Sequence, residues 1–241
     1  MMARLLMTLV SCIAVLGCGQ LPGRPKPGPE VPRPDSVVDF ATLYRQNCSA
    51  CHGADGMNGP SYPLANPTYQ ALVDEQVLHQ AVVNGVPGTL MPAFAISAGG
   101  SLTDQQVDAL VHGMRTAWYK PGALEGANLP AYKASTTANS GHGQQVYTSH
   151  CASCHGEGAG APNTGIEGKA GSILDPAFLS LVSDQVLRTV VIAGRPDIGQ
   201  PDWRSVQPGH PMSDQDVTDV VGWISSQRPS TQQGKAAGGA Q

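Results

Sequence analysis

Two short motifs carry the chemistry of this 241-residue chain. Each has two cysteines three positions apart and a histidine directly after the second: Cys48, Cys51 and His52, then Cys151, Cys154 and His155. This C-x-x-C-H spacing is typical of covalent haem attachment. One helical turn brings both thiols within reach of the vinyl groups of one porphyrin, and the next residue places an imidazole under the iron. We therefore predict two covalently bound haem c groups, with His52 and His155 as proximal iron ligands.

Three other interpretations use the same residue types. A zinc site would bring four thiolates together within a small domain, whereas about a hundred residues separate the two motifs. Redox-active disulfides would not need a histidine after each motif. Chance is the third interpretation, and the repetition of the motif in a chain whose other cysteines are Cys12 and Cys18 argues against it. Covalent haem accounts for every residue of both motifs.

The motifs belong to a tandem repeat, which sets the domain organisation. Residues 67–78 are similar to residues 176–187 at an offset of 109, and this offset holds through Gly85 and Gly194. The cysteine motifs are offset by 103. The second half is therefore expected to have a longer loop after its histidine.

Apolar spacing predicts three helices in each half. The first runs into the cysteines, the second ends at Gly85 or Gly194, and the third begins at Thr103 or Ser213. Gln106 is placed to complete a capping box with Thr103. The third helices are expected to bury a stripe of apolar residues: Val107, Leu110, Val111, Met114 and Trp118, and Val217, Val220, Val221 and Ile224.

With these features the chain resembles class I cytochromes c in a tandem dihaem arrangement, over roughly residues 37–228. The resemblance also rests on the segment Leu90-Met91-Pro92-Ala93-Phe94. It implies an all-α fold with two cytochrome c domains, each of about three helices around a covalent haem. We expect these domains at 37–120 and 139–228, a connecting strap at 121–138 and a flexible tail at 229–241.

The resemblance also implies a methionine thioether on the opposite face of each haem. Met91 fits this role in the first half, in a loop between the second and third helices, and a thioether raises the reduction potential. In the second half, the offset of 109 places Gln200 opposite Met91. The remaining methionine there, Met212, aligns with Leu102 just before the third helix, where it also suits a hydrophobic staple.

Three interpretations of the second haem stay open at this point. Met212 swings onto the iron, or Gln200 or another weak ligand such as His210 takes the position, or the iron is five-coordinate or water-ligated. An open site would bind small ligands. Arg195 and Arg204 flank this loop, as partners of haem propionates or as solvated surface charges. The remaining histidines are expected at the surface or at a haem edge.

The N-terminus predicts export and a lipid anchor. Arg4, the apolar run 5–16 and the small residues after it describe a signal peptide over 1–17. The segment 15–18 resembles the bacterial lipobox, which implies cleavage before Cys18 and lipid on its thiol; a plain signal peptide with a chance cysteine is the alternative. Six prolines in 18–36 favour an extended linker. We expect an exported protein, lipid-anchored to a bacterial cell membrane and facing the periplasm or cell exterior.

Composition excludes two classes of protein. A net charge of −4 without a basic run argues against nucleic-acid binding. No stretch of about 20 consecutive apolar residues exists, which excludes a polytopic membrane protein. Aromatic residues are only 5% of a chain with 29 glycines and 20 prolines, so its apolar core is thin, and two porphyrins would enlarge it.

A haem iron with two firm axial ligands passes one electron and binds no substrate, so the chain is predicted to be an electron carrier and not an enzyme. The family resemblance implies a membrane-tethered dihaem cytochrome between respiratory or photosynthetic complexes. Its donor would be a quinol-oxidising complex, and its acceptor a terminal oxidase or reductase. The alternatives are a dihaem peroxidase or reductase with an open second haem, a fixed haem subunit of a larger oxidoreductase complex, or a haem-based sensor.

Overall fold

The computed structural model describes residues 28, 30–156, 170–207 and 209–229. It divides into two compact units, 1–36 and 37–241, and the described part of the first contains one 3-10 turn, Pro34–Ser36. The signal peptide and Cys18 lie outside the described residues, as do most of the proline-rich linker, the extra loop after His155 and nearly all of the tail.

None of the helices in the described residues combines the length and the apolar character that a membrane span requires.

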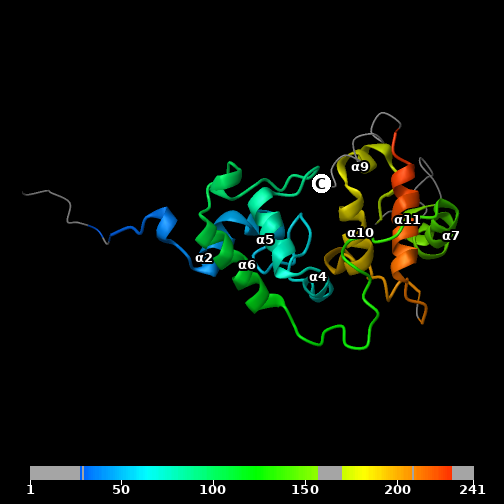
Figure 1. Ribbon diagram of the computed structural model, residues 1–241, viewed down its shortest axis with the longest axis horizontal. Coiled ribbons are helices and arrows are strands. Elements are labelled where there is room, and N and C mark those ends of the chain that lie inside the picture. Colours follow the sequence, from blue (N-terminus) through cyan, green and yellow to red (C-terminus); the bar gives the residue numbers. More distant parts are fainter. Residues whose placement is uncertain (1–27, 29, 157–169, 208, 230–241) are drawn as a thin grey trace, which may run out of the picture. The chain divides into compact units, whose positions relative to one another are not determined.

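The second unit repeats one order of helices in its two halves (Figure 1). The first half contains α2 (Phe40–Asn47), α3 (Ser49–His52), α4 (Pro67–Leu72), α5 (Glu75–Asn84) and α6 (Asp104–Trp118). The second contains α7 (Ser140–His150), α8 (Ala152–His155), α9 (Pro176–Leu181), α10 (Asp184–Ala193) and α11 (Asp214–Ser226). Short 3-10 turns follow α5 and α10, at Ile96–Ala98 and Pro196–Ile198. The described residues form no strands, which confirms the all-α prediction.

The predicted second helix of each half is two helices in the structure. After α4, Val73 adopts an extended conformation with φ −100° and ψ 136°. The Asp74 carboxylate then accepts a hydrogen bond from the backbone N of Val77 and begins α5. The second half has the same break at Val182 and Ser183. A polar N-cap residue before an apolar run is the local signal for this break.

The predicted starts of the third helices are confirmed. The Thr103 side chain accepts from the backbone N of Gln106, and the Gln106 side chain accepts from the backbone N of Thr103. Ser213 and Asp216 form the same reciprocal pair at the start of α11. Each box satisfies two backbone N–H groups that have no partner inside the helix.

The last helix of each half contributes a stripe of buried apolar residues to the core. Helix α6 packs against α2 and α5, and α11 packs against α7 and α10. The expected stripes are buried: Val107, Leu110, Val111 and Met114 on α6, and Val217, Val220, Val221 and Ile224 on α11. Trp118 is only half-buried.

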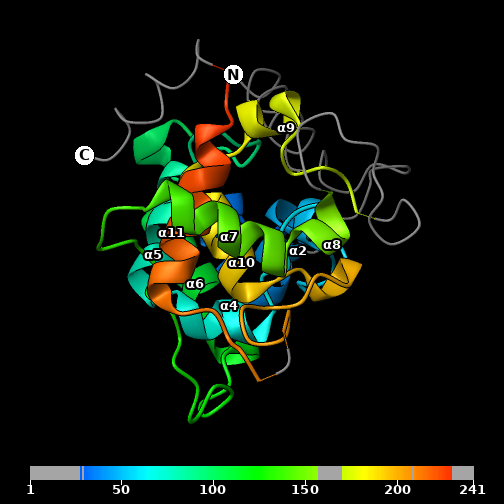
Figure 2. The ribbon, with the colours of Figure 1, turned by 90° about the vertical axis from the view of Figure 1, so that its right-hand side faces the viewer.

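The first and last helices of each half cross closely because one of them contributes a glycine. Figure 2 shows the crossing of α7 and α11. In the first half, a Cβ added to Gly113 of α6 would lie 2.2 Å from the ring of Phe40 on α2. The second half reverses the roles. A Cβ on Gly143 of α7 would lie 2.1 Å from the backbone O of Asp219 and 2.8 Å from Cβ of Trp223, both on α11.

The strap between the halves is bound to the second half. The buried Arg188 guanidinium donates to the backbone O of Ala131 and to the hydroxyl of Thr218, each at 2.9 Å, and pairs with Asp214. Gln185 donates to the backbone O of Tyr132 at 2.8 Å. Helix α10 therefore holds residues 131 and 132 of the strap, and Arg188 joins them to α11.

We expect Gly143→Ala to destabilise the haem-loaded protein by about 1 to 3 kcal/mol, because the new methyl group would overlap backbone atoms of α11. Gly141→Ala on the same helix is the matched control, since its nearest contact would be Asn139 Oδ1 at 3.5 Å. It should be neutral or slightly stabilising. Guanidinium unfolding followed by circular dichroism measures both variants, and equal effects would contradict the close crossing.

Candidate haem sites

The two cysteine motifs share one backbone conformation. The first cysteine ends one helix and begins the next, with φ −119° and ψ −36° at Cys48 and φ −120° and ψ −35° at Cys151. A glycine with positive φ follows each histidine, with 82° at Gly53 and 81° at Gly156. Glycine adopts this region without steric cost, so the chain turns away directly after each histidine. Each short helix thus supplies two thiols and one imidazole.

Both histidines are held in the tautomer that an iron ligand needs. Nδ1 of His52 lies 2.7 Å from the backbone O of Tyr62, and Nδ1 of His155 lies 2.9 Å from the backbone O of Gly171. A carbonyl only accepts, so each Nδ1 donates and each Nε2 keeps its lone pair for a metal. Burial lowers the pKa of His52, which keeps its imidazole neutral at neutral pH.

The four cysteines of the motifs are not paired in disulfides. Burial and the neighbouring Cys51 raise the pKa of Cys48 to about 11, and burial and Cys154 raise that of Cys151 to about 12. Among the described residues, no group of three or more His, Cys, Asp or Glu is placed to hold a metal ion. Two thiols and one imidazole, the donor set of each motif, fit one porphyrin.

A tyrosine four residues before each motif fixes the turn that follows it. The Tyr44 hydroxyl donates to the backbone O of Gly53 at 2.9 Å, and the Tyr147 hydroxyl donates to that of Gly156 at 2.7 Å. Burial raises the pKa of both hydroxyls, so they remain donors. Both tyrosines were predicted as residues of the first helix of each half, and neither hydroxyl was predicted to have a role at the site. Their shared position relative to the first cysteine is the signal that could have found them.

The loops on the distal side also correspond between the halves. The backbone N of Val86 donates to the O of Met91 at 3.1 Å, and the backbone N of Arg195 donates to the O of Gln200 at 3.0 Å. The offset of 109 thus holds in three dimensions through these loops. Gln200 occupies the backbone position that Met91 has in the first half.

Met212 occupies the position of Leu102. The backbone N of Met212 donates to the O of Trp203 at 3.0 Å, as that of Leu102 donates to the O of Phe94 at 2.8 Å. The Met212 residue is 4% exposed and Leu102 is 5% exposed. This burial favours the core role of Met212, and its role as an iron ligand stays a prediction.

The two arginines of the second distal loop are paired within the protein. Arg195 forms a forked ion pair with Asp197, and Arg204 forms one with Asp202, each with a shortest N–O distance of 2.6 Å. Hydrogen bonds from Arg195 lower the pKa of Asp197. Each carboxylate lies only two residues from its arginine and completes the fork locally. A contact of either arginine with a haem propionate stays a prediction.

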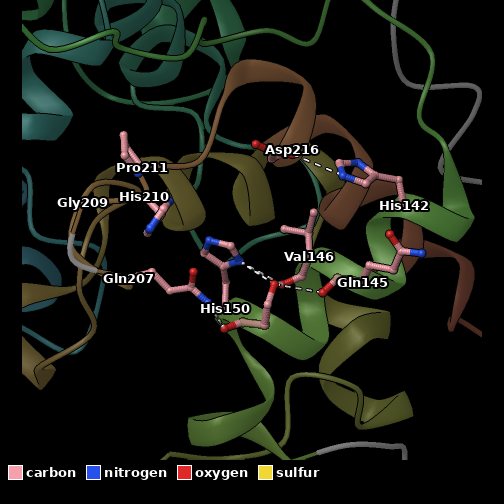
Figure 3. Close-up of a pocket in the computed structure, with 10 residues that line it drawn as sticks. His142, Gln145, Val146, His150, Gln207, Gly209, His210, Pro211 and Asp216 are labelled. Atoms are coloured by element: carbon pink, nitrogen blue, oxygen red, sulfur yellow. Dashed lines mark hydrogen bonds and ion pairs between the residues drawn. The ribbon is translucent and has the colours of Figure 1, made fainter.

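An open pocket of about 620 Å³ lies beside the second motif, between α7 and residues 207 and 209–211 (Figure 3). His142, His150 and His210 line it, and His150 directly precedes the first cysteine of the motif. Nδ1 of His142 lies 2.8 Å from the buried carboxylate of Asp219. The Gln207 side chain donates to the backbone O of Ser149 at 2.7 Å and holds the loop against α7.

The sequence matches the family described as "Cytochrome C oxidase, cbb3-type, subunit III" over residues 36–112 and 138–224. The chain belongs to this family. Each matched segment contains one C-x-x-C-H motif with its histidine, so the two segments fit tandem cytochrome c domains. Membership of this cytochrome c family implies covalent haem c, in agreement with the thiols and imidazoles described above.

Curated relatives agree with this membership. The chain is 29% identical over 156 residues to the Cbb3-type cytochrome c oxidase subunit CcoP of Azospirillum sp., covering 58% of this chain and 48% of that one. It is 26% identical over 133 residues to subunit FixPc of Rhizobium leguminosarum, covering 52% and 40%. A shorter match, 41% over 69 residues, links it to the dihydro-heme d1 dehydrogenase of Pseudomonas aeruginosa, covering 29% and 13%. The chain spans less than half the length of these relatives.

We expect Tyr147→Phe to destabilise the second half by about 1 to 3 kcal/mol, because the buried carbonyl of Gly156 loses its donor. The half-exposed Tyr119 is the matched control, since its hydroxyl makes no hydrogen bond among the described residues. Tyr119→Phe should leave the stability unchanged. Thermal unfolding of the haem-loaded variants measures both. An unchanged midpoint for Tyr147→Phe would contradict a structural role for this hydroxyl.

Proposed function

We propose that this chain is a dihaem cytochrome c that transfers single electrons within the electron-transport machinery of a membrane, and that it is not itself an enzyme. One observation carries the proposal: two short helices of the same conformation each present two thiols and one imidazole with Nε2 available to iron. Membership of a cbb3-type cytochrome c family supports it.

In this proposal each half binds its haem through the two thiols of its motif and through His52 or His155. When bound, haem c supplies one-electron chemistry at its iron. The Nδ1 hydrogen bonds orient both imidazoles and increase their basicity toward the metal. Met91 would be the distal ligand in the first half, held in a loop that its own carbonyl closes through Val86. Its soft thioether would raise the reduction potential of that site.

For the second half we propose that Gln200 stands where the methionine ligand would be, and that Met212 stays in the core. The support is the shared backbone hydrogen bonding of Gln200 with Met91 and of Met212 with Leu102. An amide is a harder and weaker ligand than a thioether, so the second site would have the lower potential. The peroxidase or reductase alternative rests on this same substitution.

The relatives are named as subunits of a cbb3-type oxidase, which supports partners among the redox complexes of a membrane. We propose a quinol-oxidising complex as electron donor and a terminal oxidase or reductase as acceptor. A lipid on Cys18 would tether the protein to the bacterial membrane, with the haem domains in the periplasm or outside the cell. Such a tether would raise its effective concentration at membrane partners.

Haem counting tests the function. Pyridine haemochrome spectra should show two haem c groups per chain in the unmodified protein. The paired variant Cys48→Ala with Cys51→Ala should keep one haem, and so should Cys151→Ala with Cys154→Ala, because each pair removes one attachment site. A chain that carries a single haem without any substitution would contradict the dihaem proposal.

The ligand assignment is tested by carbon monoxide difference spectra of the reduced protein. We expect half of the haem to respond, none to respond after Gln200→Met, and all of it after Met91→Leu. Met212→Leu should change nothing, because the first half has Leu102 at the same place. A larger response after Met212→Leu would instead assign Met212 as the ligand of the second iron.

A further inference from the structure

The two halves meet where the segment after the first haem motif reaches the end of α10. The Tyr62 hydroxyl donates to the backbone O of Gly194 at 2.9 Å. The Asn66 side-chain amide donates to the backbone O of Ala193 at 2.8 Å, and Asn66 is only 2% exposed. Helix α4, which begins directly after Asn66, packs against α10. These contacts join residues more than 120 positions apart in the chain.

Tyr62 takes part in both haem sites. Its backbone O accepts the hydrogen bond from Nδ1 of His52 at 2.7 Å, so it belongs to the proximal side of the first site. Its hydroxyl reaches Gly194 of the second half, which is the last residue before the distal loop. The ring of Tyr69 lies 5.0 Å from its own ring, between centroids, and supports its position.

Gly194, whose carbonyl binds Tyr62, is in close contact with Gln200. Directly after Gly194, Arg195 exchanges two backbone hydrogen bonds with Gln200, each at 3.0 Å. A Cβ on Gly194 would lie 2.8 Å from the backbone O of Gln200, so the two residues are in close contact. The Arg195 guanidinium also lies 5.8 Å from the centroid of the Tyr62 ring. A shift of Gly194 therefore moves the loop that carries Gln200.

The side chains of Tyr62 and Asn66 that make this contact are not repeated in the second half. Gly171 has the place of Tyr62 in the second half, and its carbonyl accepts from Nδ1 of His155 in the same way. Asp175 has the place of Asn66, and both cap the following helix with a side-chain oxygen. The haem motif needs the carbonyl and the helix needs the cap, but neither needs the two side-chain donors. The Tyr62 hydroxyl and the Asn66 amide therefore differ from the second repeat, and both bind the other half.

We propose that Tyr62 and Asn66 form an interdomain clamp through which the first half positions the distal loop of the second haem site. The clamp rests on the proposed function, since it acts on a haem site. Both residues are positioning residues: they hold the end of α10, and through Arg195 they hold Gln200. The distal side of the second site would then depend on whether the first half is docked.

Two conservative substitutions of the haem-loaded protein test the clamp. Tyr62→Phe keeps the ring and the carbonyl for His52 but removes the hydroxyl. Asn66→Asp introduces the residue of the second repeat, which keeps the helix cap but loses the amide donor. Tyr69→Phe is the control, because the Tyr69 hydroxyl makes no hydrogen bond among the described residues.

Two readouts are compared, one of which needs no redox chemistry. Small-angle scattering should show the two halves separating in both clamp variants and staying together in Tyr69→Phe. Potentiometric titration should show a shifted potential for the second haem in both clamp variants. The first haem should keep its potential, because the hydrogen bond of His52 is made by backbone.

Halves that separate without any change at the second haem would overturn the clamp and leave a merely structural contact. Halves that stay together in both variants would overturn it as well, and so would equal shifts at both haems. A failure of the proposed function would appear differently, as fewer than two haems in the unmodified protein. Scattering would still report the docking of the two halves in that case.

Discussion

Each haem motif is completed by one hydrogen bond, from Nδ1 of its histidine to a backbone carbonyl in the segment that follows. At His52 the acceptor is Tyr62, and at His155 it is Gly171. The bond fixes the tautomer of the imidazole, and with it the nitrogen that is available to iron. It also fixes where the chain returns after the motif. Helices α4 and α9 begin a few residues later, and so does the packing of each half.

The duplicated chain has kept backbone positions and changed side chains. The carbonyl of Tyr62 is matched by that of Gly171, whereas the ring and hydroxyl of Tyr62 have no counterpart. The backbone of Met91 is matched by that of Gln200. Backbone hydrogen bonds maintain the fold of each half. Side chains are therefore free to differ between the halves, as Met91 and Gln200 do, and to bind one half to the other.

In the second half, a buried arginine connects the strap to the last helix. Arg188 is 2% exposed, yet its guanidinium has partners on the strap and on α11. A buried guanidinium without such partners would be strongly unfavourable, so the strap and the helix stabilise each other's position. Arg195 is satisfied in the same way by Asp197 at the start of the distal loop. These arginine contacts hold the strap and the distal loop in defined positions in this half.

The sequence alone determined the chemistry and the repeat. Cysteine spacing, N-cap residues such as Thr103, and the offset that aligns Gln200 with Met91 are local features, and local interactions decide them. The capping signals at Asp74 and Ser183 were present in the sequence as well, although the break that they cause was not predicted. The core stripes of α6 and α11 also followed from their spacing, because helical periodicity places such residues on one face.

Only the tertiary structure decided how the two halves meet and what holds the strap. The contact of Tyr62 with Gly194 spans 132 positions, and that of Arg188 with Ala131 spans 57. Such pairings depend on how whole helices pack, and no spacing rule along the chain encodes them. The burial of Met212 was likewise left open by the sequence, since a methionine suits both a core and an iron. Its burial comes with backbone hydrogen bonds that join Met212 to Trp203 and Trp203 to Ile192 of α10.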